Sequence, residues 1–265
     1  MDIQWSLVLF TALTGAAGWM LATIAYAEVK GIQRGIAFNS ALIALIGLIV
    51  GGVCSVTHLA HPERMLGALG HPTSGIFTEA VLVGITALFT IIYLILLKRG
   101  ASEGTRKGII VIAGIFGVLL SFMSGYSYMM PSHMSWNTLL LPCGYLGTAI
   151  PAGIALYLGY AKLKGDDELG ALPKLLGIGG IVAAVLAAAY VAYAGGPDAM
   201  LLGWALAVLV GGVVPAICGF MMEKKPEGAC AMAWIAFVCA IIGCTAYRVF
   251  MWVSASIIDS FFGPL

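Results

Sequence analysis

The sequence predicts an all-α integral membrane protein with eight transmembrane helices, and three observations carry this prediction. Apolar residues make up 61% of the 265-residue chain, and the mean hydropathy is +1.03. Charged residues make up only 9%, whereas a soluble domain carries about 25%. The apolar residues also fall into eight runs, each near the roughly 20 residues that a membrane-crossing helix needs. We therefore expect one multi-pass membrane domain over residues 1–265.

The eight predicted spans are separated by short polar loops. They cover residues 5–27, 36–58, 75–97, 108–130, 138–161, 175–193, 200–222 and 230–255. Runs such as residues 41–50 are continuously apolar, whereas barrel strands alternate between polar and apolar positions, so the spans are expected to be helices. The 35 glycines favour the same interpretation, because small residues let membrane helices pack closely.

Charged residues and histidines mark where several of the predicted spans begin or end. The first span follows only Asp2, without the basic segment of a signal peptide, so we expect it to remain in the protein. The second span ends at His58, and the third has Glu79 near its start and Lys98 just after its end. The fourth span begins directly after Lys107.

The last four spans are bounded in the same way. Lys162 follows the fifth span, Lys174 precedes the sixth and Lys224 follows the seventh. The eighth span is the only one of these four with a charged residue in its interior, Arg248.

Basic residues predict the orientation of the bundle. Eleven of the thirteen lie in or beside the loops on one side: Lys30, Arg34, Lys98, Arg99, Arg106, Lys107, Lys162, Lys164, Lys174, Lys224 and Lys225. The opposite loops contain only Arg64. Because basic loops stay in the cytoplasm, both termini and the loops 59–74, 131–137 and 194–199 are expected to face outward. In a bacterium this places the protein in the cell inner membrane, with its outer face toward the periplasm.

Three ionisable residues lie within the predicted spans, all toward the outer side: His58, Glu79 and Arg248. Arg248 comes eighteen residues after Cys230, which at 1.5 Å per residue is about 27 Å from the inner surface. An ionisable group inside a span costs about 2.5–3.5 kcal/mol at the membrane centre, so such residues are functional candidates. The inner face, by contrast, is expected to hold only solvated lysines and carboxylates.

Further polar and aromatic residues share this outer level. They are Arg64, His61, His71 and His133 in the loops, together with Tyr126, Tyr128 and Trp136. Each has a simpler interpretation: the aromatic residues as an interfacial belt, Arg248 as a side chain reaching to the interface, and the loop histidines as solvated groups. Glu79 is harder to explain in this way, because its neighbours are apolar. His58 and the partly desolvated carboxyl of Glu79 together form a pair suited to accept protons.

The sequence offers little sign of a bound metal or cofactor. The six cysteines are scattered, without Cys-x-x-Cys pairs or iron–sulfur spacings. Haem ligation by two histidines would need facing residues within two spans, and only His58 qualifies. The net charge of +1 gives no basic surface for nucleic acid. If the protein handles electrons, we expect it to bind a diffusible carrier in the lipid.

Several short motifs resemble the membrane-anchor subunits of the dimethyl sulfoxide reductase family. The stretch from Ser55 through His58 and Pro62 to Arg64 is similar to the family's His-Leu-x-x-Pro-x-Arg motif, and Thr78-Glu79 stands where the family has Asn-Glu. The stretch from Trp136 to Gly144 and the run from Tyr247 to Phe250 also resemble family elements. The broader group is the eight-helix anchors of the polysulfide-reductase type.

The resemblance implies an anchor without haem that oxidises menaquinol. Its partners would be a ferredoxin-like iron–sulfur subunit and a molybdopterin catalytic subunit, both docked on the outer face. The motif matches carry the quinol role onto His58 and Glu79, with Arg64 nearby. Together with the residues at the same level, they make a predicted quinol-binding set of His58, Arg64, Glu79, Tyr126, Trp136 and Arg248. In this set Arg64 or Arg248 would hold the Glu79 carboxylate or the developing quinone oxygen.

Two other functions remain open at this stage. A secondary transporter would use helices broken at Pro142, Pro151 or Pro215, although no charge lies at the middle of the membrane. A haem-bearing anchor would ligate iron through His58 with His61 or His133. Solute uptake by vesicles and a visible absorption spectrum separate these alternatives from a quinol anchor.

Overall fold

The computed structural model describes the chain apart from residues 1–2, 33, 58–66, 68–69, 72 and 255–265. Within the described part every regular element is helical, and eight helical segments are long and apolar enough to cross a membrane. The prediction of an all-α protein with eight membrane helices is therefore confirmed.

The spans begin and end as follows. They are α1 (Trp5–Lys30), α2 (Ala37–Thr57), α3 (Gly75–Lys98), α4 (Glu103–Tyr126), α5 (Leu140–Leu163), α6 (Leu172–Ala194), η4 (Met200–Val213) continuing into α7 (Val214–Lys224), and α8 (Ala229–Val253). Short 3₁₀ turns precede α2, η4 and α8: η1 (Arg34–Ile36), η3 (Pro197–Ala199) and η5 (Pro226–Gly228).

Two spans differ from the hydropathy prediction in an informative way. The fourth, predicted over 108–130, begins at Glu103, because the Ser102 hydroxyl accepts a hydrogen bond from the Thr105 amide and caps the helix outside the apolar run. The seventh begins as a π-helix, η4, and becomes α-helical only at Val214. Hydropathy reports burial in lipid, so it does not detect caps or the hydrogen-bond pattern of the backbone.

The end of α1 corrects one expectation about the inner face. The helix continues to Lys30, where Gly31 adopts a left-handed conformation with φ of 74° and its amide bonds back to Ala27 and Glu28. Glu28 therefore lies on the helix and is only 3% exposed. Its carboxylate lies 3.3 Å from Nε of Arg106 on α4. The prediction that this face holds only solvated charges was wrong, because it placed Glu28 in a loop.

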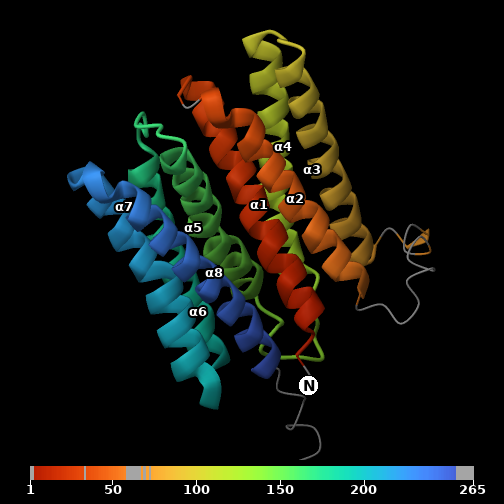
Figure 1. Cartoon of the computed structure of the whole chain (residues 1–265). Helices are drawn as coiled ribbons and strands as arrows, with labels where there is room; N and C mark the ends of the chain where they lie inside the picture. Colours follow the sequence, from red (N-terminus) through yellow and green to blue (C-terminus); the bar gives the residue numbers. More distant parts are fainter. Residues whose placement is uncertain (1–2, 33, 58–66, 68–69, 72, 255–265) are drawn as a thin grey trace, which may run out of the picture.

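The bundle consists of two four-helix halves. Figure 1 shows α1–α4 on one side and α5–α8 on the other, with α1 packed against both α4 and α5. The spans α1 and α5 are the most deeply buried. Where α1 crosses α4, a Cβ atom on Gly18 would lie 2.3 Å from the Gly117 carbonyl oxygen. This crossing is therefore possible only with glycine, as expected for close membrane helices.

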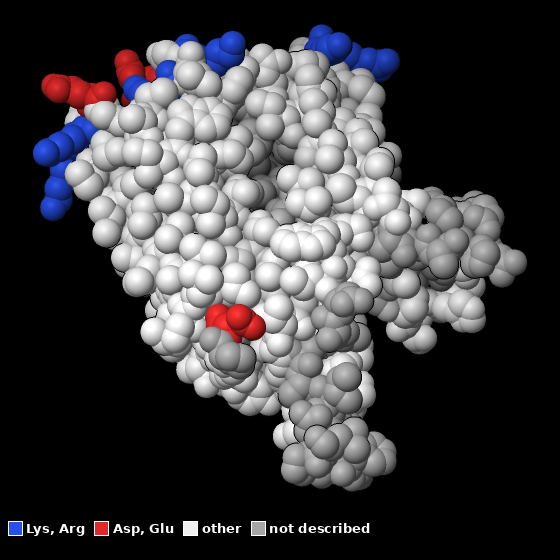
Figure 2. Space-filling view, turned by 60° about the horizontal axis from the view of Figure 1, so that its bottom comes forward, with Lys and Arg blue, Asp and Glu red and all other residues white. Residues whose placement is uncertain are grey.

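The two ends of the bundle carry different charges. The starts of α1 and α3 and the ends of α2 and α4 share one end, at the bottom of Figure 1. The connections from α3 to α4 and from α5 to α6 share the other. In Figure 2 the Lys and Arg side chains gather at the rim formed by this second end, while the face turned to the reader shows little charge. The arrangement agrees with the charge pattern of the sequence, and the assignment of the lysine-poor end to the outside stays a prediction.

Candidate functional site

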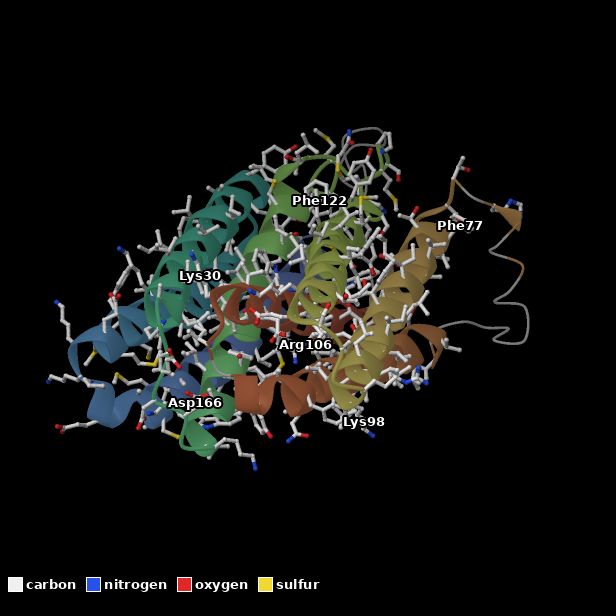
Figure 3. The ribbon with its side chains drawn as sticks, turned by 90° about the horizontal axis from the view of Figure 1, so that it is seen from above. Lys30, Phe77, Lys98, Arg106, Phe122 and Asp166 are labelled. Atoms are coloured by element: carbon white, nitrogen blue, oxygen red, sulfur yellow. The ribbon has the colours of Figure 1, made fainter. Side chains whose placement is uncertain are left out.

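The site is centred on Glu79, near the start of α3. Ser74 caps this helix by accepting a hydrogen bond from the Phe77 amide. Figure 3 labels Phe77 at the end of α3 that carries Glu79, and Lys98 at the opposite end. The Glu79 side chain is only 8% exposed. The helix thus holds a carboxylate inside the bundle, close to the lysine-poor end.

A serine on the neighbouring helix is the hydrogen-bond partner of Glu79. The Ser127 hydroxyl, at the end of α4, donates to Oε1 of Glu79 over 2.6 Å. The two helices come this close because Gly75 has no side chain: a Cβ there would lie 2.5 Å from Cβ of Ser127. No charged group among the described residues pairs with this carboxylate.

Next to Ser127, Tyr128 begins an aromatic cluster. Its ring centroid lies 6.0 Å from those of Tyr145 and Trp136 and 5.9 Å from that of Trp252. Burial raises the pKa of the Tyr128 hydroxyl well above its ordinary value; Tyr145 and Glu79 raise it further, and Arg248 lowers it. Tyr128 therefore stays protonated, and it lies within electrostatic reach of both Glu79 and Arg248.

Arg248 is completely buried between three helices. Its Nε donates to the Thr11 hydroxyl over 2.8 Å, and Nη2 donates to the Thr11 carbonyl over 3.1 Å. Nη1 donates to the Cys244 carbonyl over 2.8 Å. The guanidinium carbon lies 4.4 Å from the centre of the Tyr145 ring.

These contacts decide between the alternatives for Arg248. The side chain points into the bundle, so it is not a group that reaches out to the interface. The hydrogen bonds to Thr11 and Cys244 use neutral acceptors, and no described carboxylate forms an ion pair with Arg248. Of the roles expected for Arg64 or Arg248, holding the Glu79 carboxylate is not one that Arg248 has here, since Glu79 is bonded to Ser127; a role toward the quinone oxygen stays a prediction.

The two predicted aromatic residues have different surroundings. Trp136 is 1% exposed, and its indole Nε1 donates to the Met251 carbonyl over 2.8 Å, so it is a core residue rather than part of an interfacial belt. Tyr126 is 47% exposed and stacks on Phe122, at a centroid distance of 6.3 Å. An interfacial belt fits Tyr126.

The remaining predicted polar residues divide into described and undescribed ones. His58, His61 and Arg64 lie outside the described residues. The ring of His133 lies 4.6 Å from that of Trp136, and its Nδ1 is buried without a hydrogen-bond partner among the described residues. His71 is exposed.

Sequence reasoning missed the neutral residues of this site. The residue type alone did not single out Ser127, Tyr145, Thr11 or Thr148. Hydroxyl side chains are common in membrane helices and usually bond to their own helix. The available signal was depth: Thr11 and Thr148 lie about as far from the lysine-poor ends of their spans as Arg248 does from the end of α8. In the part of the chain that the structure describes, no three His, Cys, Asp or Glu side chains lie close enough together to hold a metal ion.

Comparison with known proteins identifies the family. No curated protein sequence matches this chain. The family model of the DMSO reductase anchor subunit matches residues 1–193, which include α1–α5 and nearly all of α6, and with them Glu79, Ser127 and Trp136. The match ends before η4, so Arg248 lies outside it. With eight apolar helices and a family match over most of its length, the chain is a multi-pass membrane protein that belongs to the DMSO reductase anchor subunit family.

Proposed function

We propose that this chain oxidises menaquinol in the outer leaflet of the cell inner membrane. In this role it anchors a ferredoxin-like iron–sulfur subunit and a molybdopterin catalytic subunit on its outer face and passes them the electrons. Family membership supports the anchor role and favours it over transport. The observation that carries the quinol site is the Glu79 carboxylate, buried at one end of the bundle and hydrogen-bonded by Ser127 at 2.6 Å.

Quinol oxidation releases two protons and two electrons, so the site needs a proton acceptor that lipid can reach. Glu79 supplies a carboxylate for this purpose, since its bond to Ser127 is its only one to a described side chain. The neighbouring positions Ile76 and Ala80 on α3 are exposed on the bundle surface, where the quinol tail can remain in lipid. A base placed within hydrogen-bond reach of the ring hydroxyl takes the proton as the electrons leave.

The buried guanidinium of Arg248 is the second charged group that we assign to the site. Both Arg248 and Glu79 affect the pKa of Tyr128, which adjoins Ser127, the hydrogen-bond partner of Glu79. A positive charge in a low-dielectric site favours the negative charge that develops on a quinol oxygen as its proton leaves. In this proposal Arg248 acts through space, and it is linked to Tyr128 by the Tyr145 ring, which contacts both.

We assign the second ring oxygen to His58 and a supporting role to Arg64 on the sequence motif alone. The last described residue before them, Thr57, ends α2 at the same end of the bundle as Glu79. A histidine that titrates near neutral pH is suited to accept the second proton and release it outward. The electrons then pass to the iron–sulfur subunit, which lies against this end.

The test is quinol oxidation by membranes that hold the whole complex. We expect Glu79→Gln and His58→Ala each to reduce oxidation of a menaquinol analogue nearly to background, because each removes a proton acceptor. Ser127→Ala is expected to cause a partial loss, because it removes only the hydrogen bond that orients Glu79. Unchanged subunit content in purified complexes would show that assembly persists.

A matched control is Glu223→Gln, the same substitution at an exposed position of α7 near the lysine-bearing end. It should leave quinol oxidation unchanged. Wild-type rates in both Glu79→Gln and His58→Ala complexes would contradict the proposed site.

A further inference from the structure

A cavity lined by basic residues lies at the lysine-bearing end of the bundle, opposite the Glu79 site. Its volume is about 430 Å³, and it opens between the start of α2, the end of α3 and the start of α4. It is lined by Gly35, Phe38, Leu97, Lys98 and Arg106. Two of these described lining residues are cations and none is an acid. The cavity therefore offers a positively charged site at the level where helices leave the membrane.

Both cations are held in place by their neighbours. Nζ of Lys98 lies 5.2 Å above the Phe38 ring, a cation–π arrangement. Nε of Arg106 lies 3.3 Å from the buried Glu28 carboxylate on α1. Glu28 thus engages the Nε edge of the guanidinium, and the rest of Arg106, which is 21% exposed, borders the cavity. Figure 3 labels Lys98 and Arg106 at the neighbouring ends of α3 and α4.

Apolar side chains lead from this cavity along the surface of the bundle. On α2, exposed aliphatic residues recur at helical spacing at Leu42, Ile46 and Ile49. On α3, Ile95 and Leu88 continue a similar exposed surface. Positions three, four and seven residues apart lie on one face of a helix. From the level of the cavity toward the middle of the membrane, both helices thus offer exposed apolar side chains to acyl chains.

A neighbouring cavity at the same end differs in the charges that line it. It has about 590 Å³ and includes Lys164, but Asp166, Asp167 and Glu168 also line it. These carboxylates would repel a phosphate group. The cavity at Lys98 and Arg106 has no such acid among its described lining residues.

From these observations we infer that the cavity at Lys98 and Arg106 binds the headgroup of an anionic phospholipid from the leaflet on the lysine-bearing side. The phosphate lies between the two cations, and the acyl chains follow the exposed faces of α2 and α3. Basic cavities between membrane helices on this side are suited to such headgroups. The lipid would connect α2 with α3, a pair that packs sparsely compared with α1 and α4.

Native mass spectrometry of the full chain in detergent tests this assignment, by titrating phosphatidylglycerol against phosphatidylcholine with the same acyl chains. We expect the wild type to retain phosphatidylglycerol preferentially. Lys98→Gln should weaken that binding about five-fold, which corresponds to about 1 kcal/mol for one basic residue near the headgroups. Lys164→Gln, in the neighbouring cavity, is the matched control and should leave binding unchanged.

Arg106 needs a different variant, because its loss alone would leave the buried Glu28 carboxylate without its described ion-pair partner. The double variant Glu28→Gln with Arg106→Gln removes the cation and the buried charge together, and it should weaken phosphatidylglycerol binding to a similar extent. Equal retention of the two lipids by the wild type would overturn the inference, as would unchanged binding in both Lys98→Gln and the double variant. Displacement of the lipid by millimolar inorganic phosphate would show a site for soluble anions and would also overturn it.

Discussion

Arg248 is the residue whose position is hardest to explain by stability alone. It is fully buried, and its described partners, Thr11 and Cys244 among them, are neutral. Removing a charge from water costs several kcal/mol, which neutral partners offset only in part. An apolar residue at this position would serve packing at least as well. The cost of the buried charge is the reason to connect Arg248 with the quinol oxidation proposed at Glu79.

The first prediction therefore concerns Arg248. Arg248→Met should leave thermal stability unchanged or higher, because a buried charge is replaced by an apolar side chain of similar length. Quinol oxidation by the complex should nevertheless fall at least ten-fold, because the positive potential near the site is lost. Thermal unfolding and quinol oxidation measured on the same preparations check both parts.

Arg248→Lys serves as the control for charge. Lysine keeps the positive charge, but it lacks the planar guanidinium whose nitrogens donate to Thr11 and Cys244 at the same time. We expect an intermediate rate of quinol oxidation. A rate for Arg248→Met equal to that of the wild type would show that this arginine has no part in the reaction.

At the scale of elements, the site depends on how closely α4 packs against its neighbours. Glycines permit two approaches: Gly75 brings α3 to Ser127, and Gly117 brings α4 to Gly18 on α1. A Cβ on Gly117 would lie 2.6 Å from Cα of Gly18, so the backbones themselves would have to separate. Since Ser127 lies at the end of α4, a shift of this helix also changes its bond to Glu79.

The second prediction tests this packing with two alanine substitutions in one helix. Gly117→Ala should destabilise the protein by about 1–3 kcal/mol, the usual cost of overpacking. It should also reduce quinol oxidation by displacing Ser127.

Gly108→Ala is the matched control, because nothing lies within 4 Å of a Cβ added there. It should be neutral or slightly stabilising, since alanine favours the helix by up to about 1 kcal/mol. Thermal unfolding of the two variants in one detergent gives the comparison. Equal stabilities for both variants would contradict the described α1–α4 crossing.

At the scale of the whole molecule, our proposals give the two ends of the bundle different roles. The proposed quinol site lies at the lysine-poor end, and the proposed lipid site lies at the lysine-bearing end. Electron transfer favours a short gap between the quinol and the first cluster of the partner. The iron–sulfur subunit is therefore expected on the lysine-poor end.

The third prediction is that crosslinks from the partner subunits fall on loops 59–74, 131–137 and 194–199. Lys98 and Lys224, at the other end, should remain free of them. Mass spectrometry of the crosslinked complex gives the measurement. Crosslinks to Lys98 or Lys224, without any to the three loops, would reverse the predicted topology.

The fourth prediction is that turnover is electroneutral. Protons from quinol should leave on the same side on which the catalytic subunit takes up protons. On the buried face of α3 beyond Glu79, the described polar residues before Tyr93 are Thr86 and Thr90, which donate to carbonyls of their own helix over 2.7 Å. This arrangement offers no ionisable group to carry a proton along that stretch.

Vesicles that contain the whole complex and a potential-sensitive dye give the measurement. Addition of quinol should produce turnover without a sustained potential. An uncoupler-sensitive potential would reveal a proton path across the bundle.

The sequence by itself determined the fold class, the number of spans and the asymmetry of charge between the two ends. These follow from composition and hydropathy, which depend on one residue at a time and on the thickness of the bilayer. It also marked Glu79 and Arg248, because an ionisable residue in an apolar run is visible in the sequence alone. The family resemblance could be seen in the same short motifs, and the family match confirmed it.

Only the tertiary structure decided which groups meet. Ser127 binds Glu79 from 48 positions away, and Thr11 binds Arg248 from 237 positions away. Trp136 became a core residue because the end of α8 covers it, and Glu28 became buried because α4 supplies Arg106. Such pairings depend on helix crossings, which backbone approach at a few glycines makes possible. Hydropathy records the preference of each residue for lipid, but it carries no information on which face of a helix meets which neighbour.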